Sequence, residues 1–182
     1  QTLYSNTTGG QNTAVGRKAM YTNTTGDNNV SVGFNSMFFN TTGADNAALG
    51  TNALQANTTG NYNVAIGRQS LTANTTASQN TAVGYQALED NTTGSPNTAI
   101  GYQTLYSNTT GGQNTGIGVQ AGYSSTTASY NTFMGWETGY AVTTGEYNTF
   151  LGRYAGRSLT TGDVNCFVGV NSGYLMTTGS SN

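Results

Sequence analysis

Asn80-Thr81-Ala82-Val83-Gly84 is one copy of a short motif that returns every 17 residues along the whole chain. Its glycine recurs from Gly16 to Gly169 and its asparagine from Asn12 to Asn182, with no insertion or deletion between copies. A second motif, Thr-Thr-Gly, keeps the same spacing with alanine replacing its glycine in two units. Repetition at a fixed period of this size is typical of stacked supersecondary units. The sequence therefore predicts an all-β fold, a parallel β-solenoid of ten coils.

Two neighbouring places of the unit are apolar, counting its asparagine as place one. Place three is small in the earlier units and phenylalanine in the last three, whereas place four is always aliphatic. Successive residues of a strand face opposite sides, so we expect a strand buried on both faces. We predict that place four fills the interior of each coil and that place three packs between copies of the chain. The predicted core column comprises Val15, Val32, Leu49, Ile66, Val83, Ile100, Ile117, Met134, Leu151 and Val168.

The unit changes type once along the chain. Place nine is leucine or methionine as far as Leu105 and glycine from Gly122 onward, and the phenylalanines at place three begin at Phe133. Because a protein interior is filled to a nearly constant density, we interpret these as compensating changes within one packed layer. The sequence predicts a single solenoid domain over residues 1–182, with the change near residues 116–125 and the variant coil type from about 117 onward. Its first and last units lack the polar caps of solenoids, so we expect a segment of a longer fibre.

Two further repeated residues have a predicted structural role. The glycine at place five is never replaced, so we expect a positive φ or a close backbone approach there. The asparagine column predicts a ladder of side-chain amides that bond from coil to coil, as accompanies in-register stacking.

Composition excludes several classes of function. The net charge is -2 and only 7% of the residues are charged, so no basic stripe is available for nucleic acid. No apolar run approaches the roughly 20 residues of a membrane span. A charge-poor chain rich in Thr and Asn with little cysteine suits an extracellular location, which we expect to be a cell surface, a secreted filament or a virion. Cys166 is the one cysteine, and we expect a buried free thiol.

The sequence contains few of the residue types that catalysis requires. Without histidine or a cysteine pair, neither a hydrolytic triad nor a zinc site can be assembled, and we expect no enzyme activity, cofactor or metal. Glu146 and Asp163, one coil apart, are the only pair of carboxylates that would suit a glycosidase. We interpret them as unpaired surface acids.

Aromatic residues recur at three places of the unit and are candidates for a binding surface. An aromatic ring can pack on a sugar or a protein while a polar tip stays in water, so a surface glycan or a protein receptor is the expected ligand. The alternative is that stacked rings only stiffen the rod or pack between chains. The candidate residues are Tyr85, Tyr102, Tyr106, Tyr123, Trp136 and Tyr140.

Asn-Thr-Thr sequences recur at place twelve and match the acceptor pattern for N-glycans. Turn chemistry explains them as well, because Asn and Thr side chains bond to nearby backbone groups. The candidate acceptors are Asn6, Asn23, Asn40, Asn57, Asn74, Asn91 and Asn108. The repeated Thr-Thr pair also suggests ice binding, but adjacent threonines of a strand point to opposite sides, so only one row can face outward.

The units Asn63-Val64-Ala65-Ile66-Gly67 and Asn97-Thr98-Ala99-Ile100-Gly101 resemble the Asn-Ser-Val-Ala-Ile-Gly repeats of trimeric autotransporter adhesin heads. The chain is equally similar to repeat arrays of phage tail-fibre-like proteins. The resemblance implies a left-handed parallel β-roll with three chains around one axis, a homotrimer. We therefore predict a structural and adhesive segment of an extracellular or virion-surface fibre. The alternatives are a filament subunit joined end to end and an ice-binding solenoid.

Overall fold

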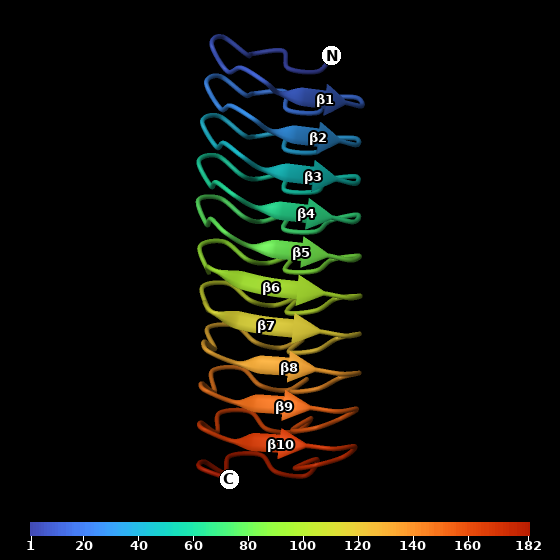
Figure 1. The fold of residues 1–182 in the computed structure, drawn as a ribbon, viewed down its shortest axis with the longest axis vertical. Helices are drawn as coiled ribbons and strands as arrows, with labels where there is room; N and C mark the ends of the chain where they lie inside the picture. Colours follow the sequence, from blue (N-terminus) through green and yellow to red (C-terminus); the bar gives the residue numbers. More distant parts are fainter.

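The computed structural model describes residues 1–182 and shows a rod of stacked coils without any helix (Figure 1). Each coil contributes one short strand to the same side of the rod. The strands are β1 (Thr13–Val15), β2 (Val30–Val32), β3 (Ala47–Leu49), β4 (Val64–Ile66), β5 (Thr81–Val83), β6 (Asn97–Ile100), β7 (Asn114–Ile117), β8 (Thr132–Met134), β9 (Thr149–Leu151) and β10 (Cys166–Val168).

The ten strands form one parallel sheet in the order of the sequence. Each strand pairs with the next in the same register, so that Ala82 lies opposite Ala99 and Val83 opposite Ile100. Every place of the unit therefore becomes a column that runs along the rod. The predicted parallel β-solenoid is confirmed.

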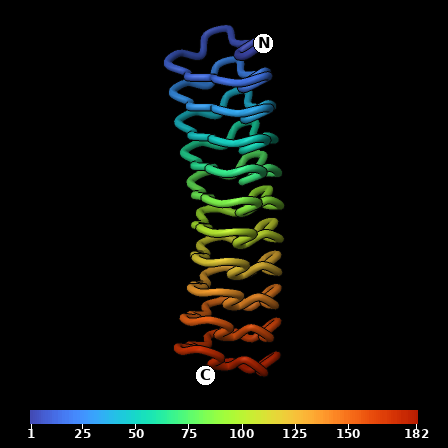
Figure 2. Tube along the Cα trace, turned by 90° about the vertical axis from the view of Figure 1, so that its right-hand side faces the viewer, coloured from blue at the N-terminus to red at the C-terminus, as the bar shows by residue number.

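Most backbone hydrogen bonds lie outside the strands: 95 of the 115 join turns and loops. The Thr-Thr-Gly turn shows why. The carbonyl oxygen of Thr24 accepts hydrogen bonds from the amides of Thr7, Thr8 and Gly9 in the coil before it, at 3.0, 3.2 and 3.3 Å. The hydroxyl of Thr7 donates to the same oxygen at 2.8 Å. The turns thus stack as closely as the strands, and the coils remain parallel over the whole rod (Figure 2).

The glycine at place five has the positive φ that its invariance predicts. At Gly84 φ is +139°, and a Cβ built there would collide with the carbonyl oxygen of Gly101 in the next coil. An L-residue rarely adopts this backbone conformation, and the neighbouring coil leaves no room for a side chain. Both expected reasons for a glycine hold at this corner.

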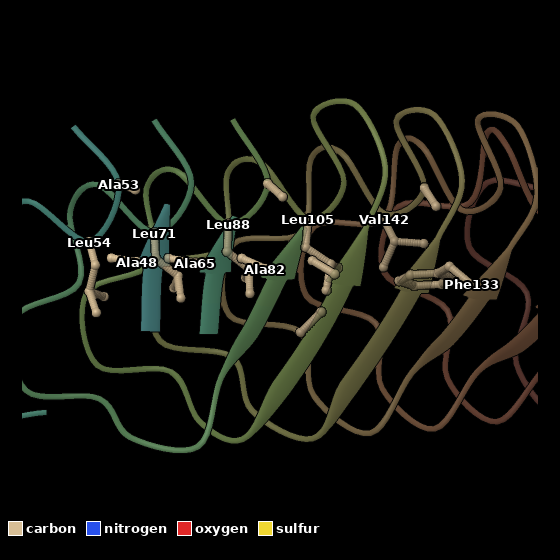
Figure 3. Close-up of a cluster of buried hydrophobic side chains, with 14 of the residues drawn as sticks. Ala48, Ala53, Leu54, Ala65, Leu71, Ala82, Leu88, Leu105, Phe133 and Val142 are labelled. Atoms are coloured by element: carbon tan, nitrogen blue, oxygen red, sulfur yellow. The ribbon is translucent and has the colours of Figure 1, made fainter. Parts of the chain in front are cut away.

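The interior of the rod contradicts the predicted core column. Place three points inward, where Ala82 and Phe133 are fully buried and pack with place-nine residues such as Leu88 (Figure 3). Place four points outward. Most of the predicted core side chains are exposed, at 56% for Val15, 50% for Leu49, 39% for Ile66, 40% for Ile100, 37% for Met134, 45% for Leu151 and 62% for Val168. Val32, Val83 and Ile117 are half-buried on the same outer face.

The physical reason is space. A coil of 17 residues encloses only a narrow interior, and the leucine or methionine of place nine already occupies much of it. Alanine at place three fits beside that residue, whereas a column of isoleucine and leucine would overfill the coil. In the last coils a phenylalanine at place three takes the interior, and glycine replaces the place-nine side chain.

Cys166 also differs from expectation. Its thiol is free, as predicted, but it is exposed because place two shares the outward side of the strand with place four. The structure has no helix that is long and apolar enough to cross a membrane.

Candidate binding surfaces

The asparagine columns are structural ladders. At place one, the Asn63 amide nitrogen of the backbone donates to Oδ1 of Asn46 at 2.9 Å, and its Nδ2 donates to the carbonyl oxygen of Ala77 at 2.9 Å. The same pattern repeats in the coils around it. The predicted ladder is confirmed, and it uses both ends of each side-chain amide.

The candidate glycan acceptors at place twelve form a second ladder. Nδ2 of Asn74 donates to Oδ1 of Asn57 at 2.9 Å and to the carbonyl oxygen of Ala77 at 3.0 Å. Nδ2 is the atom that would carry a glycan. Asn23, Asn40, Asn57, Asn74, Asn91 and Asn108 are fully buried, and Asn6 is half-buried with its Nδ2 bonded to Gly9. The folded rod has no room for a glycan at the buried positions, so the interpretation as turn chemistry is the one that the structure supports.

The candidate aromatic residues belong to two separate columns. Tyr106, Tyr123 and Tyr140 stack at place ten with ring centroids 5.1 Å apart. Tyr85 and Tyr102 stack at place six at 5.4 Å. Because the rings cover one another, the columns turn edges and hydroxyl groups outward instead of ring faces. A sugar therefore finds no row of open ring faces along them.

Burial raises the pKa of Tyr106 and Tyr123, and the nearby charge of Glu89 raises the pKa of Tyr106 further. Both phenols therefore stay protonated at physiological pH and can donate hydrogen bonds. Trp136 differs from these residues. It is 50% exposed, it stacks on no other ring, and its Nε1 donates to Oε1 of Glu137 at 3.0 Å.

Arg157 occupies place ten itself, between Tyr140 and Tyr174 of the same column. Nε of Arg157 bonds to Oε2 of Glu137 at 2.6 Å, and its guanidinium lies 5.2 Å from the ring centre of Tyr140 and 5.6 Å from that of Tyr154. The hydrogen bond to Glu137 raises the pKa of Arg157. The cation thus occupies the space between the rings that a cationic ligand would need. The sequence signal for this cluster is the opposite charge of Glu137 at place seven and Arg157 at place ten of the next unit.

The outer face of the sheet carries a long row of exposed apolar side chains. Place four supplies an exposed aliphatic side chain on seven of the ten strands and a half-buried one on the other three, and we call this column the outer aliphatic row. Place six adds exposed aromatic side chains beside it: Phe34, Tyr102 and Trp136. Ten strands at a spacing of about 4.8 Å make this face roughly 45 Å long. Contiguous apolar surfaces of this extent mark interaction sites in soluble proteins.

The threonine pair presents only one outward row, as predicted. The hydroxyl of the first threonine donates to the next coil, as in Thr58 to the carbonyl oxygen of Thr75 at 3.0 Å. The second threonine, such as Thr59, is exposed. The turn therefore lacks the paired rows that the ice-binding interpretation requires.

Of the two candidate carboxylates, that of Asp163 is bonded to the backbone of the coil before it. Oδ1 of Asp163 accepts a hydrogen bond from the backbone amide of Glu146 at 2.8 Å, so its role is to join adjacent coils. Asp27 makes the same bond to the amide of Gly10. No group of three His, Cys, Asp or Glu side chains is placed to hold a metal ion.

The rod thus presents an outer aliphatic row, stacked tyrosine rings and polar turns. No protein-family model matches this sequence, and no curated protein or solved structure is significantly similar to the chain.

Proposed function

We propose that this chain is a rigid segment of an extracellular fibre, on a cell surface or a virion, and that three copies pack along their outer aliphatic rows. The observation that carries the proposal is the exposure of this row along the whole sheet, from Val15 at 56% to Val168 at 62%. A row of half-exposed aliphatic side chains in water is unfavourable, and its burial against equivalent rows stabilises an assembly.

The geometry of the rod favours copies of the same chain as the partner. The side chains of each column are one coil apart. Two parallel copies of the rod have the same distance between coils, so their outer aliphatic rows can stay in register over their whole length. The charges do not oppose close approach, because only 7% of the residues are charged. The resemblance to trimeric adhesin heads suggests three chains, and it is the reason to prefer a trimer to a dimer.

A fibre of this kind acts by presenting the same surface groups many times to a receptor. Identical groups recur along each of three rods, so a weak contact at one coil is repeated at the next, and avidity exceeds the affinity of any single contact. The exposed threonines of the polar turns lie outside the outer aliphatic row and remain available for a glycan or protein receptor. Catalysis is not part of this proposal.

The test is the oligomeric state of the rod. Sedimentation velocity of the wild-type chain should show a trimer over the micromolar range. Ile100→Asp combined with Leu49→Asp should give monomers with the same β-sheet circular dichroism, because both residues lie outside the coil interior. Thr93→Asp, on the exposed turn, is the matched control and should leave the trimer intact. A wild-type monomer at all concentrations would contradict the proposal, and particles that lengthen with concentration would indicate an end-to-end filament instead.

A further inference from the structure

Tyr130 and Tyr147 form the closest pair of stacked tyrosines on the rod. Their ring centroids are 4.7 Å apart with an angle of 6° between the planes, whereas the other tyrosine stacks have 4.9 to 5.4 Å. The two side chains are also well exposed, at 47% and 55%. They therefore combine close contact with free access for a reagent.

The repeat itself holds this pair together. Both residues occupy place 17, where the chain has a positive φ, +61° at Tyr130 and +58° at Tyr147. The amide of Tyr130 donates to the carbonyl oxygen of Gly112 at 3.1 Å, and that of Tyr147 donates to Ser129 at 3.3 Å. The backbone of each residue is thus bonded to the coil before it, and only the rings have freedom to move. Near-parallel rings at this centroid separation bring the ortho carbons of the two phenols to neighbouring positions.

We propose that Tyr130 and Tyr147 are a site of oxidative cross-linking that joins two adjacent coils as dityrosine. The co-reactant is hydrogen peroxide activated by a haem peroxidase. Each phenol loses one electron and one proton, and the two phenoxyl radicals form a carbon–carbon bond between their ortho positions. The two displaced ring hydrogens move to the phenol oxygens, and the peroxide is reduced to two molecules of water. The modification does not depend on the fibre proposal, because both residues belong to one chain.

The cross-link would have a structural consequence. It closes a loop of one unit between neighbouring coils, and a covalent loop reduces the entropy of the unfolded chain. The variant coils near Tyr147 would then resist local opening more strongly than they do through hydrogen bonds alone.

The chain contains a matched control in Tyr62. This residue occupies the same place of the unit, is 61% exposed and has a φ of +58°, but its column neighbours are Asp45 and Gln79. Tyr62 is thus at least as accessible as Tyr130 and Tyr147 and has a similar backbone conformation, and it differs in having no stacked partner.

The experiment treats the wild-type chain, Tyr147→Phe and Tyr62→Phe at low protein concentration with horseradish peroxidase and hydrogen peroxide. Dityrosine fluorescence and the masses of cross-linked peptides are measured. We expect the wild type and Tyr62→Phe to give a cross-linked peptide pair that contains Tyr130 and Tyr147 and has lost two hydrogen atoms, and Tyr147→Phe to lose most of the fluorescence. Fluorescence that survives Tyr147→Phe, or cross-links found only between chains or mainly within the Tyr106–Tyr123 stack, would overturn the proposal.

Discussion

The ring of Phe133 fills the space above Gly139 in the same coil: a Cβ built on Gly139 would lie 2.6 Å from Cδ1 of that ring. In the earlier coil type an alanine takes the place of the phenylalanine, and a leucine with a φ near +50°, such as Leu105, takes the place of the glycine. One interior volume is therefore filled by either of two pairs of side chains.

This exchange predicts strong coupling between the two positions. Phe133→Ala should destabilise the rod by about 3 kcal/mol through loss of packing, and Gly139→Leu should cost about 2 kcal/mol through overpacking. The double variant restores the earlier pair, and we expect a coupling energy of about 1–3 kcal/mol in its favour. Urea unfolding of the four proteins measures it. Additive effects would show that the two side chains do not share a volume.

A second prediction separates backbone strain from steric collision at place five. Gly84→Ala places a Cβ against the carbonyl oxygen of Gly101 at a φ of +139°, and we expect a loss of at least about 3 kcal/mol. Gly169→Ala has a φ of +119° with no atom within 4 Å of the added Cβ, so it carries only the conformational cost of about 1–2 kcal/mol. Thermal unfolding of the two variants compares them. Equal losses would assign the invariance of this glycine to conformation alone.

A third prediction concerns the buried ladder at place twelve. Asn74→Ala removes the donor to Oδ1 of Asn57 and leaves Nδ2 of Asn91 without the acceptor it has at 3.1 Å. Unsatisfied buried polar groups cost about 1–3 kcal/mol each, so we expect a loss of roughly 3 kcal/mol or more. Thr76→Ala, two residues further on the exposed row, should change the unfolding free energy by less than about 0.5 kcal/mol. Similar losses for the two variants would mean that the ladder is not a stabilising element.

A fourth prediction concerns pH. Burial, and then repulsion from Asp90, raise the pKa of Glu89, and its Oε2 is buried without a partner. A carboxyl whose pKa is higher in the folded than in the unfolded state destabilises the fold as pH rises through that interval, and the cost is absent below the unfolded pKa. Glu89→Gln should therefore raise the melting temperature at neutral pH and have little effect at about pH 3.5. Gln55 already occupies this column two coils earlier, which makes the substitution a conservative one. An equal gain at both pH values would exclude ionisation as the cause.

The repeat register could be predicted from the sequence because it depends only on spacing. The constant spacing between copies of Asn80 and Gly84 predicts the parallel pairing, the columns and the amide ladder. Which face of the strand points into the coil could not be predicted in the same way. Places three and four are both apolar, and alternation alone does not say which of two apolar faces lies inside.

A signal for the correct face was nevertheless present. Phenylalanine appears at place three in step with the loss of the place-nine side chain, while place four remains aliphatic throughout. Two positions that exchange volume must share an interior, so the change from Leu105 to Gly122 already assigned place three, not place four, to the core. The convergence of three amides on the carbonyl oxygen of Thr24 was not predictable, because it depends on turn geometry that residue types alone do not specify.

The bonds of the Thr-Thr-Gly turn reach only from one coil to the next, and the ladders do the same. Duplication of a single unit within one coil type would therefore lengthen the rod by about 4.8 Å and repeat every existing joint without altering any side chain. A duplicated segment that spans the boundary near Gly116 would instead place a coil of one type next to a coil of the other type, and their interior side chains would not match. The length of such a rod can therefore change in equal increments of one coil, provided that each unit gained or lost lies within one coil type.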